Sequence, residues 1–327
     1  MEIKTNVGNL KNYQIYLKVE SAVNEYLQKK GYLKVDLPVL SPSLIPESYL
    51  EVFETEFRFL DKKEKLYLTP SPELFLKRLI VHGIGDCYFL GKSFRNSDPS
   101  ASLHSPEFTM LEFYKVGANY MNIADEVLEM LKFISQKLKI QNHKVSFEKW
   151  EKISVAEAFK KFAGIKEQEL FNHKLFVKKA EEKGYRTTGF SYEDLWSQIY
   201  VQEIEKHLGE NGCPTLIYDY PKEFAALAKL NSDKKTAQRF EFYINGIELG
   251  DCYTELTNWQ EQEERFNEAQ KERRKNKKII HKIDSGFIDA LKYGLPDCAG
   301  IAIGFERLAL IFSKAKSIKE LKLINIV

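Results

Sequence analysis

The chain has 327 residues, of which 43% are hydrophobic and 29% charged. This is the composition of a folded globular protein and excludes wholesale disorder. The 49 basic and 47 acidic side chains leave a formal net charge of +2, so we expect no extended nucleic-acid surface and no DNA partner. No apolar stretch approaches the length of a membrane span, and the four widely spaced cysteines fit reduced thiols in the cytoplasm.

The N-terminal third is predicted to combine helices with short strands. Apolar residues at helical spacing predict an amphipathic helix over residues 10–30, which Gly31 ends. Strands are predicted over 32–35 and, as a pair, within 53–68. Pro72 opens a further predicted helix, because proline suits the first helical turn.

The middle of the chain begins with strands predicted over residues 87–90 and 107–114, followed by an amphipathic helix over 121–139. Residues from about 140 to 235 are polar, and we expect a mainly helical insertion that carries no chemistry. The predicted organisation is therefore a single domain over 1–327 that contains this insertion.

The C-terminal third is predicted to begin with a β-hairpin. Two runs with strand character, 239–244 and 247–256, are joined by Asn245-Gly246, the dipeptide that most favours a two-residue hairpin turn. A highly charged helix is predicted over 259–278, and a strand that runs into a helix over 300–308. Antiparallel hairpins with helices to one side indicate an α+β fold.

Charged residues gather at three places in this pattern. Arg95 lies at a predicted strand end, and Arg307 follows a glycine near the C-terminus. Glu241 and Glu248 lie on the two strands of the predicted hairpin, where both carboxylates can approach one cation. The basic run 271–282 is predicted to be a solvated helix end, with docking of an acidic protein or an RNA as the alternative.

These motifs resemble those of class II aminoacyl-tRNA synthetases. Phe94-Arg95 and the strand after Pro106 are similar to motif 2, and residues 304–307 are similar to motif 3. The segment 31–38 is similar to motif 1, which builds the dimer interface of that family. The resemblance covers nearly the whole chain, in the order that the family has.

A closer resemblance is to lysyl-tRNA synthetases, and closer still to their truncated relatives that ligate (R)-β-lysine to a lysine of translation elongation factor P. Residues 71–79, 105–114 and 239–249 carry the first, and residues 294–304 carry the second. Because the first predicted helix already begins at residue 10, we expect no N-terminal anticodon-binding domain.

The resemblance implies a class II synthetase-type catalytic domain, an antiparallel sheet flanked by helices. It implies an ATP-dependent ligase that forms AMP and pyrophosphate while it activates (R)-β-lysine or lysine, with Mg²⁺ as the metal ion. The acceptor would be elongation factor P, and the enzyme a cytoplasmic homodimer without a tRNA or membrane partner. Two alternatives remain: a synthetase-like enzyme that charges tRNA or another amine with a related amino acid, and a non-catalytic paralogue.

For ATP, the resemblance implies two arginines as catalytic residues. Arg95 would clamp the α-phosphate, and Arg307 would stack on adenine or hold the γ-phosphate, since arginine is always charged and binds phosphate with two hydrogen bonds. Phe108 would stack on adenine, and His104 would lie by the triphosphate. The other implied ATP-binding residues are Asn96, Ser97, Ser105 (where the family usually has asparagine), Glu248, Leu249 and Gly304.

For the metal, the resemblance implies Glu241 and Glu248 as ligands. Magnesium prefers a few carboxylates together with phosphate oxygens and water, so two protein ligands suffice when ATP supplies the rest.

For the amino acid, the resemblance implies a set of buried polar groups. Tyr114 and Glu255 would bind the distal ammonium, and Glu73 and Glu112 the other amino group, because a buried ammonium must be paired. Asp251 stands where the family has an asparagine near the substrate carboxylate, so it would repel that carboxylate unless it is protonated or a cationic group pairs with it. The remaining implied substrate residues are Ser71 and Ala302. Lysyl-tRNA synthetases usually have a glycine at the position of Ala302, whereas an alanine there matches the β-lysine ligase pattern.

Overall fold

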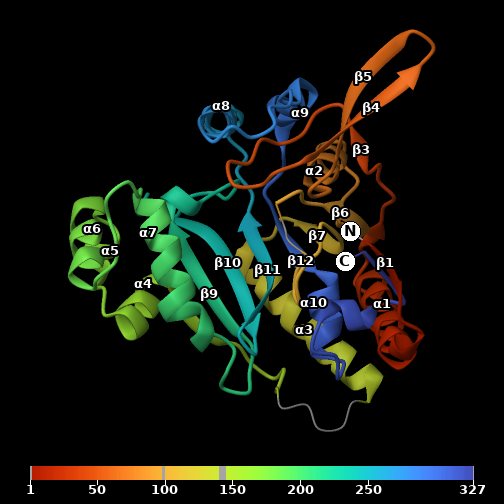
Figure 1. Ribbon diagram of the computed structural model, residues 1–327, viewed down its shortest axis with the longest axis horizontal. Coiled ribbons are helices and arrows are strands. Elements are labelled where there is room, and N and C mark those ends of the chain that lie inside the picture. Colours follow the sequence, from red (N-terminus) through yellow and green to blue (C-terminus); the bar gives the residue numbers. More distant parts are fainter. Residues whose placement is uncertain (1, 98–99, 140–144, 327) are drawn as a thin grey trace. The chain divides into compact units, whose positions relative to one another are not determined.

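The computed structural model describes residues 2–97, 100–139 and 145–326. These residues form two compact units, which we call unit 1 and unit 2. Unit 1 comprises Met1–Ala118, Phe133–Ile140 and Leu256–Val327. Unit 2 comprises Asn119–Lys132 and Gln141–Glu255, so that helix α3 (Tyr120–Leu138) contributes to both (Figure 1). The first residues of the predicted insertion, 140–144, lie outside the described chain.

Unit 1 is built on four strands that pair in the order β2, β6, β7, β12. The inner pairs β6–β7 and β7–β12 are antiparallel, whereas β2 pairs with β6 in parallel. Because β7 is hydrogen-bonded along both edges and mostly apolar, its residues 109–114 are all buried. The bounds of these strands are β2 (Leu33–Lys34), β6 (Cys87–Phe94), β7 (Glu107–Val116) and β12 (Cys298–Gly304).

Two helices of unit 1 contact each other. Helix α1 (Leu10–Lys29) ends as predicted: Gly31 adopts φ +89°, a conformation that glycine tolerates best. It contacts α10 (Phe305–Ile311), where the ring of Tyr16 meets Phe305 edge-on at a centroid distance of 5.0 Å. In α10, the carboxylate of Glu306 accepts hydrogen bonds of 3.0 and 2.9 Å from the backbone of Thr109, which fastens this helix to β7.

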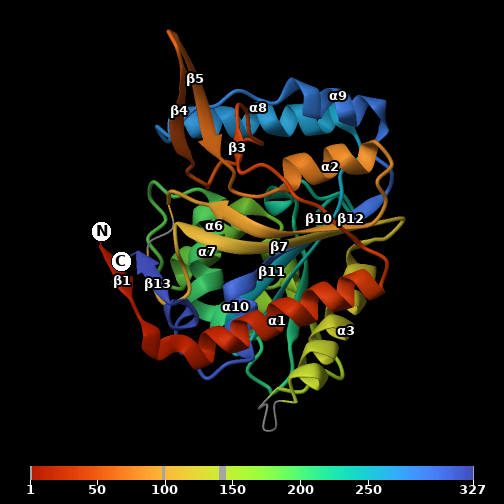
Figure 2. The ribbon, with the colours of Figure 1, turned by 90° about the vertical axis from the view of Figure 1, so that its right-hand side faces the viewer.

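A second group of helices in unit 1 packs around α9 (Ser285–Gly294), a helix that the sequence pattern does not predict. It contacts both α2 (Glu73–Val81) and α8 (Trp259–Lys275), as Figure 2 shows. The predicted strand pair within 53–68 is present, and the chain termini are joined by a further pair. The bounds of these shorter strands are β1 (Ile3–Thr5), β3 (Leu40–Ser41), β4 (Phe53–Phe59), β5 (Lys62–Leu68) and β13 (Ile324–Ile326).

The basic run 271–282 is only partly the solvated surface that was predicted. Arg274, Lys275 and Lys277 are exposed, but the side chain of Arg273 is only 1% exposed. Its guanidinium donates to the backbone oxygens of Ile279, Glu47 and Leu50 and lies 3.1 Å from the carboxylate of Glu51. Arg273 is therefore a structural residue of unit 1, and the prediction of a solvated face is wrong at this position.

Unit 2 is built on strands that pair in the order β11, β10, β9, β8. The pairs β11–β10 and β10–β9 are antiparallel, and β8 pairs with β9 in parallel. The predicted hairpin is present, with Asn245 at φ +53° and Gly246 at φ +70°, the left-handed values that a type I′ turn requires. The bounds are β8 (Glu151–Ser154), β9 (Thr215–Pro221), β10 (Thr236–Ile244) and β11 (Ile247–Thr254).

The region between β8 and β9 forms helices around an aromatic core. Phe159, Phe176, Trp196 and Tyr200 are buried together there, and Tyr220 of β9 packs against them. Figure 1 shows this group of helices on one side of β9. The residue pattern does not predict β8 and β9, because β8 is four residues long and β9 lacks a clear polar alternation. The helices are α4 (Val155–Ala158), α5 (Glu167–Leu170), α6 (His173–Glu182) and α7 (Tyr192–Ile199), with π-helical turns at Phe159–Ala163 and Tyr200–Ile204.

Candidate active site

Arg95 and Phe108, the residues implied for phosphate and adenine, lie together in unit 1. The guanidinium carbon of Arg95 is 5.2 Å from the centroid of the Phe108 ring. The Arg95 backbone N–H donates to the carbonyl of Pro106 at 2.9 Å, so the end of β6 is held beside the start of β7. The Nε of Arg95 is buried, and no described residue accepts its hydrogen. Since a buried donor without an acceptor is costly, this position fits an anionic ligand such as a phosphate.

Arg307 and His104 are also brought together. Arg307 lies in the first turn of α10, after Gly304 at the helix N-cap. Its Nε donates to the carbonyl of Leu103 at 3.1 Å, and its Nη2 lies 2.8 Å from Nε2 of His104. Because a guanidinium is only a donor, the neutral imidazole accepts here, and the pair presents positive charge at the α10 N-terminus.

The other candidates in the loop that joins β6 and β7 are less enclosed. The side-chain amide of Asn96 donates to the carbonyl of Val52 at 3.2 Å, which anchors the start of the loop. Ser97 is exposed and Ser105 is half-buried.

Glu112 is the centre of the amino-acid candidates in unit 1. Its side chain is among the buried polar groups, 2% exposed. One carboxylate oxygen accepts from the hydroxyl of Ser71 at 2.8 Å, and the other accepts from Tyr114 at 3.0 Å. Burial, followed by the nearby charge of Glu73, raises the pKa of Glu112 to about 8. A cation bound beside it would favour the ionised form.

Glu73 interacts with Lys77, a residue for which the sequence motifs imply no role. The ammonium of Lys77 contacts the carboxylate of Glu73 one helical turn away on α2, and Lys77 is 1% exposed. With both carboxylates ionised, Glu73, Glu112 and Lys77 sum to one negative charge. A single amino group of a ligand is the complement of that charge.

Strand β12 pairs with β7 and places two small residues opposite Tyr114 and Glu112. Gly300 is paired with Tyr114 and Ala302 with Glu112. A Cβ added at Gly300 would lie 2.3 Å from the Tyr114 ring, so only glycine leaves that ring in place. Ala302 is half-buried and directly opposite Glu112, so its methyl group adds bulk at that position.

The acidic candidates of unit 2 form a cluster around Arg239. This residue donates from Nη2 to Glu241 at 2.8 Å, and from Nε and Nη2 to the two oxygens of Asp251 at 2.9 and 3.0 Å. Glu241 and Asp251 are cross-strand partners on β10 and β11. The hydroxyls of Tyr243 and Tyr253 complete the cluster, the first donating to Glu241 at 2.8 Å and the second to Asp251 at 2.7 Å.

The implied metal ligands fit a magnesium ion that is completed by phosphate. Among the described residues, no three or more His, Cys, Asp or Glu side chains are placed so that they could hold a metal ion by themselves. Glu241 and Glu248 are hard oxygen donors near enough to interact, since the charge of Glu248 helps to raise the pKa of Glu241. Burial is the largest cause of that rise, to about 7, and Arg239 opposes it. A divalent cation bound here would, like Arg239, lower the pKa of Glu241.

The remaining candidates of unit 2 lie on or just after β11. Leu249 is buried within the strand, and Glu255 is 1% exposed and bridged to Ala228 through the backbone. The sequence motifs imply no role for Arg239, Tyr243 or Tyr253. The signal was available for the first two, because residues 239, 241 and 243 share a spacing of two along a strand.

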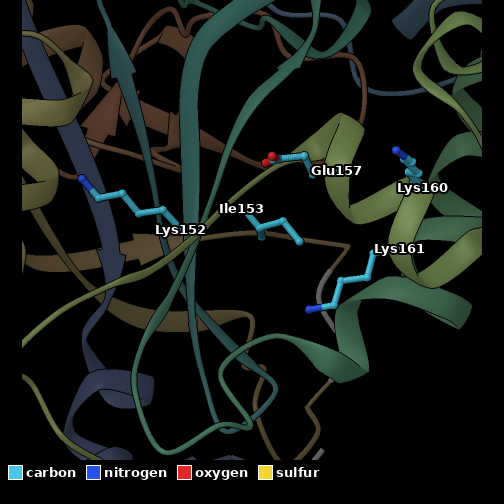
Figure 3. Close-up of a pocket in the computed structure, with 5 residues that line it drawn as sticks. All are labelled: Lys152, Ile153, Glu157, Lys160 and Lys161. Carbon is cyan, nitrogen blue, oxygen red and sulfur yellow. The ribbon is translucent and has the colours of Figure 1, made fainter.

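Unit 2 also contains a shallow surface pocket of about 410 Å³, which does not include any of the candidate residues (Figure 3). The residues that line it are Lys152, Ile153, Glu157, Lys160 and Lys161.

The family comparison agrees with the motifs. Residues 4–324 match the sequence model of the family described as tRNA synthetases class II (D, K and N). The chain belongs to this family. It is similar to the "Elongation factor P--(R)-beta-lysine ligase" of Avibacterium paragallinarum, with 34% identity over 93% of this chain and 91% of that relative. The protein of the same name from Histophilus somni (strain 2336) is 34% identical over 98% of this chain and 96% of its own length.

A second kind of relative is matched over part of its length. The "Lysine--tRNA ligase" of Staphylococcus haemolyticus is 30% identical over 99% of this chain but 66% of its own length. Near full-length matches therefore place the chain in the family of the elongation factor P ligases within the class II synthetases. The predicted family and the predicted α+β fold class are confirmed, and the chain is an ATP-dependent amino-acid ligase.

None of the helices in the described ranges combines the length and the apolar character needed to cross a membrane.

Proposed function

We propose that this ligase activates (R)-β-lysine or lysine as an aminoacyl-adenylate and transfers it to a lysine of elongation factor P. The observation that carries the proposal is the group of Glu73, Lys77 and buried Glu112, which carries one net negative charge when a bound ammonium ionises Glu112. The names of the relatives from Avibacterium and Histophilus support the same acceptor.

The reaction has two steps. The substrate carboxylate attacks the α-phosphorus of ATP and pyrophosphate leaves, after which the acceptor amine attacks the adenylate carbonyl and AMP leaves. The protein contributes mainly positioning and charge neutralisation. Arg95 would hold the α-phosphate, Phe108 the adenine face, and Arg307 with His104 the outer phosphates or the base. Asn96, Ser97, Ser105, Leu249 and Gly304 would complete the ATP contacts.

Magnesium bound with ATP would neutralise phosphate charge, and Glu241 and Glu248 would hold it. Arg239 and Tyr243 each occupy one lone pair of Glu241, and a carboxylate oxygen has a second. The hydrogen bonds seen in the structure are therefore compatible with metal ligation.

Recognition of the amino acid would depend on two ammonium positions. Tyr114 and Glu255 would bind the distal ammonium, while Glu73 and Glu112, with Ser71, would bind the other. An uncharged analogue would bring no ammonium to these carboxylates, so we expect strong rejection of it. Asp251 would lie near the substrate carboxylate with its charge offset by Arg239.

We further propose that the enzyme is a homodimer and acts in the cytoplasm. The similarity of residues 31–38 to motif 1 supports the dimer. Cys87, Cys213, Cys252 and Cys298 form no disulfide, which is compatible with a reducing compartment.

Charging of tRNA is a second candidate function. The similarity to a lysine–tRNA ligase over 99% of this chain favours it. The alternative of a non-catalytic paralogue is not supported, since the chain belongs to a family of ligases and has both candidate arginines and both candidate metal ligands.

The deciding experiment measures ATP–pyrophosphate exchange with lysine, (R)-β-lysine and norleucine, followed by transfer of the labelled amino acid to elongation factor P or to lysine tRNA. We expect exchange with a diamino acid, none with norleucine, and label on elongation factor P. Label on tRNA alone would establish the second candidate. Absence of exchange with any amino acid would contradict both.

A further inference from the structure

Three buried tyrosine hydroxyls form a chain that ends on Glu241. Tyr243 donates to Oε2 of Glu241 at 2.8 Å, and Tyr200 donates to the hydroxyl oxygen of Tyr243 at 3.2 Å. The hydroxyl oxygen of Tyr220 lies 3.1 Å from that of Tyr200. All three tyrosines are buried. We call Tyr220, Tyr200 and Tyr243 the tyrosine relay.

The relay begins in the region that sequence analysis expected to carry no chemistry. Tyr200 opens the π-helical turn that follows α7, a kind of irregularity that is frequent at functional sites. Tyr220 lies on β9 and Tyr243 on β10. The relay therefore connects the helical core of unit 2 to the proposed metal ligand.

The rings of the relay are held in place by packing. Trp196 stacks on Tyr200 with a centroid distance of 4.8 Å and an interplanar angle of 11°. The Arg239 guanidinium lies over the Tyr220 ring at 4.6 Å. Rings fixed in this way hold their hydroxyls at set positions, which is the condition for orienting another group.

Packing alone does not account for these hydroxyls. Phenylalanine would fill nearly the same volume, and burying a hydroxyl costs free energy unless it is hydrogen-bonded. Here the hydrogen bonds lead to one oxygen of Glu241, while Arg239 holds the other oxygen at 2.8 Å. Both oxygens of a carboxylate that we propose as a metal ligand are thus fixed by donors.

We propose that Tyr243 and Tyr200 are positioning residues that orient the Glu241 carboxylate toward the magnesium of bound ATP. The inference rests on the proposed metal role of Glu241. Groups that orient a ligand through hydrogen bonds commonly change metal affinity by about 10–100-fold when removed. The helical core of unit 2 thereby takes part in ATP binding.

The test compares Tyr243→Phe and Tyr200→Phe with the matched control Tyr192→Phe. Tyr192 is buried in the same aromatic core, but its hydroxyl donates to the backbone carbonyl of Leu170 at 3.0 Å. Calorimetry measures ATP binding at a series of Mg²⁺ concentrations, with Mn²⁺ binding by spin resonance as a second readout. Thermal unfolding reports the structural cost of each change.

We expect Tyr243→Phe to weaken Mg²⁺-dependent ATP binding about 10-fold. Tyr200→Phe should act in the same direction but less, because it is one hydroxyl further away. The Tyr192→Phe variant should lose thermal stability without a change in Mg²⁺ dependence. If all three variants show the same Mg²⁺ dependence as the wild type, the inference is overturned.

A second comparison uses the Glu241→Ala background. There Tyr243→Phe should have no further effect, since its action passes through Glu241. An undiminished effect in that background would overturn the relay while leaving the metal site intact. If Glu241→Ala itself leaves Mg²⁺-dependent ATP binding unchanged, the proposed metal role fails and the relay with it, whereas the exchange assay reports on the ligase function separately.

Discussion

Arg239 holds Asp251 through two parallel hydrogen bonds, from Nε to Oδ1 at 2.9 Å and from Nη2 to Oδ2 at 3.0 Å. Such a two-point contact between guanidinium and carboxylate is among the stronger side-chain interactions. It supplies the cationic partner that an aspartate at this position requires. Asp251 is therefore charge-compensated within unit 2.

We predict that Asp251→Asn destabilises the protein and lowers activation of the diamino acid. Removing one partner of a largely buried ion pair costs about 3–5 kcal/mol when the other charge stays unpaired, and the remaining Glu241 contact reduces that loss. Denaturant unfolding and exchange rates measure the two effects. Faster activation of (R)-β-lysine at unchanged stability would show instead that Asp251 repels the substrate carboxylate.

We predict that Gly300→Ala weakens binding of the amino acid. The added Cβ would lie 2.3 Å from the Tyr114 ring, so the ring and its hydrogen bond to Glu112 must move. The KM for the diamino acid should rise at least about 10-fold, as expected when a substrate group loses its polar partner. Binding of ATP alone is the control and should change little. An unaltered KM would show that Tyr114 does not contact the substrate.

We predict that Arg273→Met is strongly destabilising although it lies in a basic run. The change removes the charge beside Glu51 and leaves the backbone carbonyls of Glu47 and Leu50 without this donor. The expected loss is about 3–5 kcal/mol in the free energy of unfolding. The neighbouring exposed residue provides the control: Arg274→Met should stay within about 0.5 kcal/mol of the wild type. Equal effects of the two changes would contradict the structural role of Arg273.

We predict that His281 makes the protein less stable as the pH falls below neutrality. Burial lowers the pKa of His281 to about 4, from about 6.5 in the unfolded chain. Between these values the unfolded chain binds a proton that the folded chain does not, so stability is lost from pH 6.5 down to pH 4, by up to about 3 kcal/mol. His281→Phe keeps a ring against Tyr67 and should flatten this dependence. The substitution His82→Gln, at an exposed histidine, is the control.

We predict that Ala302→Gly broadens the choice of amino acid toward α-lysine. Ala302 on β12 is paired with Glu112 on β7, so removal of its methyl group enlarges the space beside Glu112. One methyl group is worth about 1–3 kcal/mol of discrimination. The ratio of kcat/KM for (R)-β-lysine to that for lysine measures the change. A ratio that does not move would mean that Ala302 has no part in this specificity.

Local patterns were enough to predict much of the chain. The helix that ends at Gly31, the strand pair within 53–68 and the Asn245-Gly246 hairpin are all present. Each depends on the side-chain periodicity of a few neighbouring residues, or on the backbone freedom of one glycine, and both are properties of a short segment. The order of the motifs along the chain was likewise sufficient to predict the family.

The partners of the charged and hydroxyl groups were decided by the tertiary structure. Tyr200 and Tyr243 are 43 positions apart, and Arg273 meets a carbonyl 226 positions away. Strand register and core packing bring such groups together, and neither is a property of the local sequence. The same holds for burial: an arginine in a charged helix has the polarity of a surface residue wherever it lies, and only the surrounding chain determines whether water reaches it.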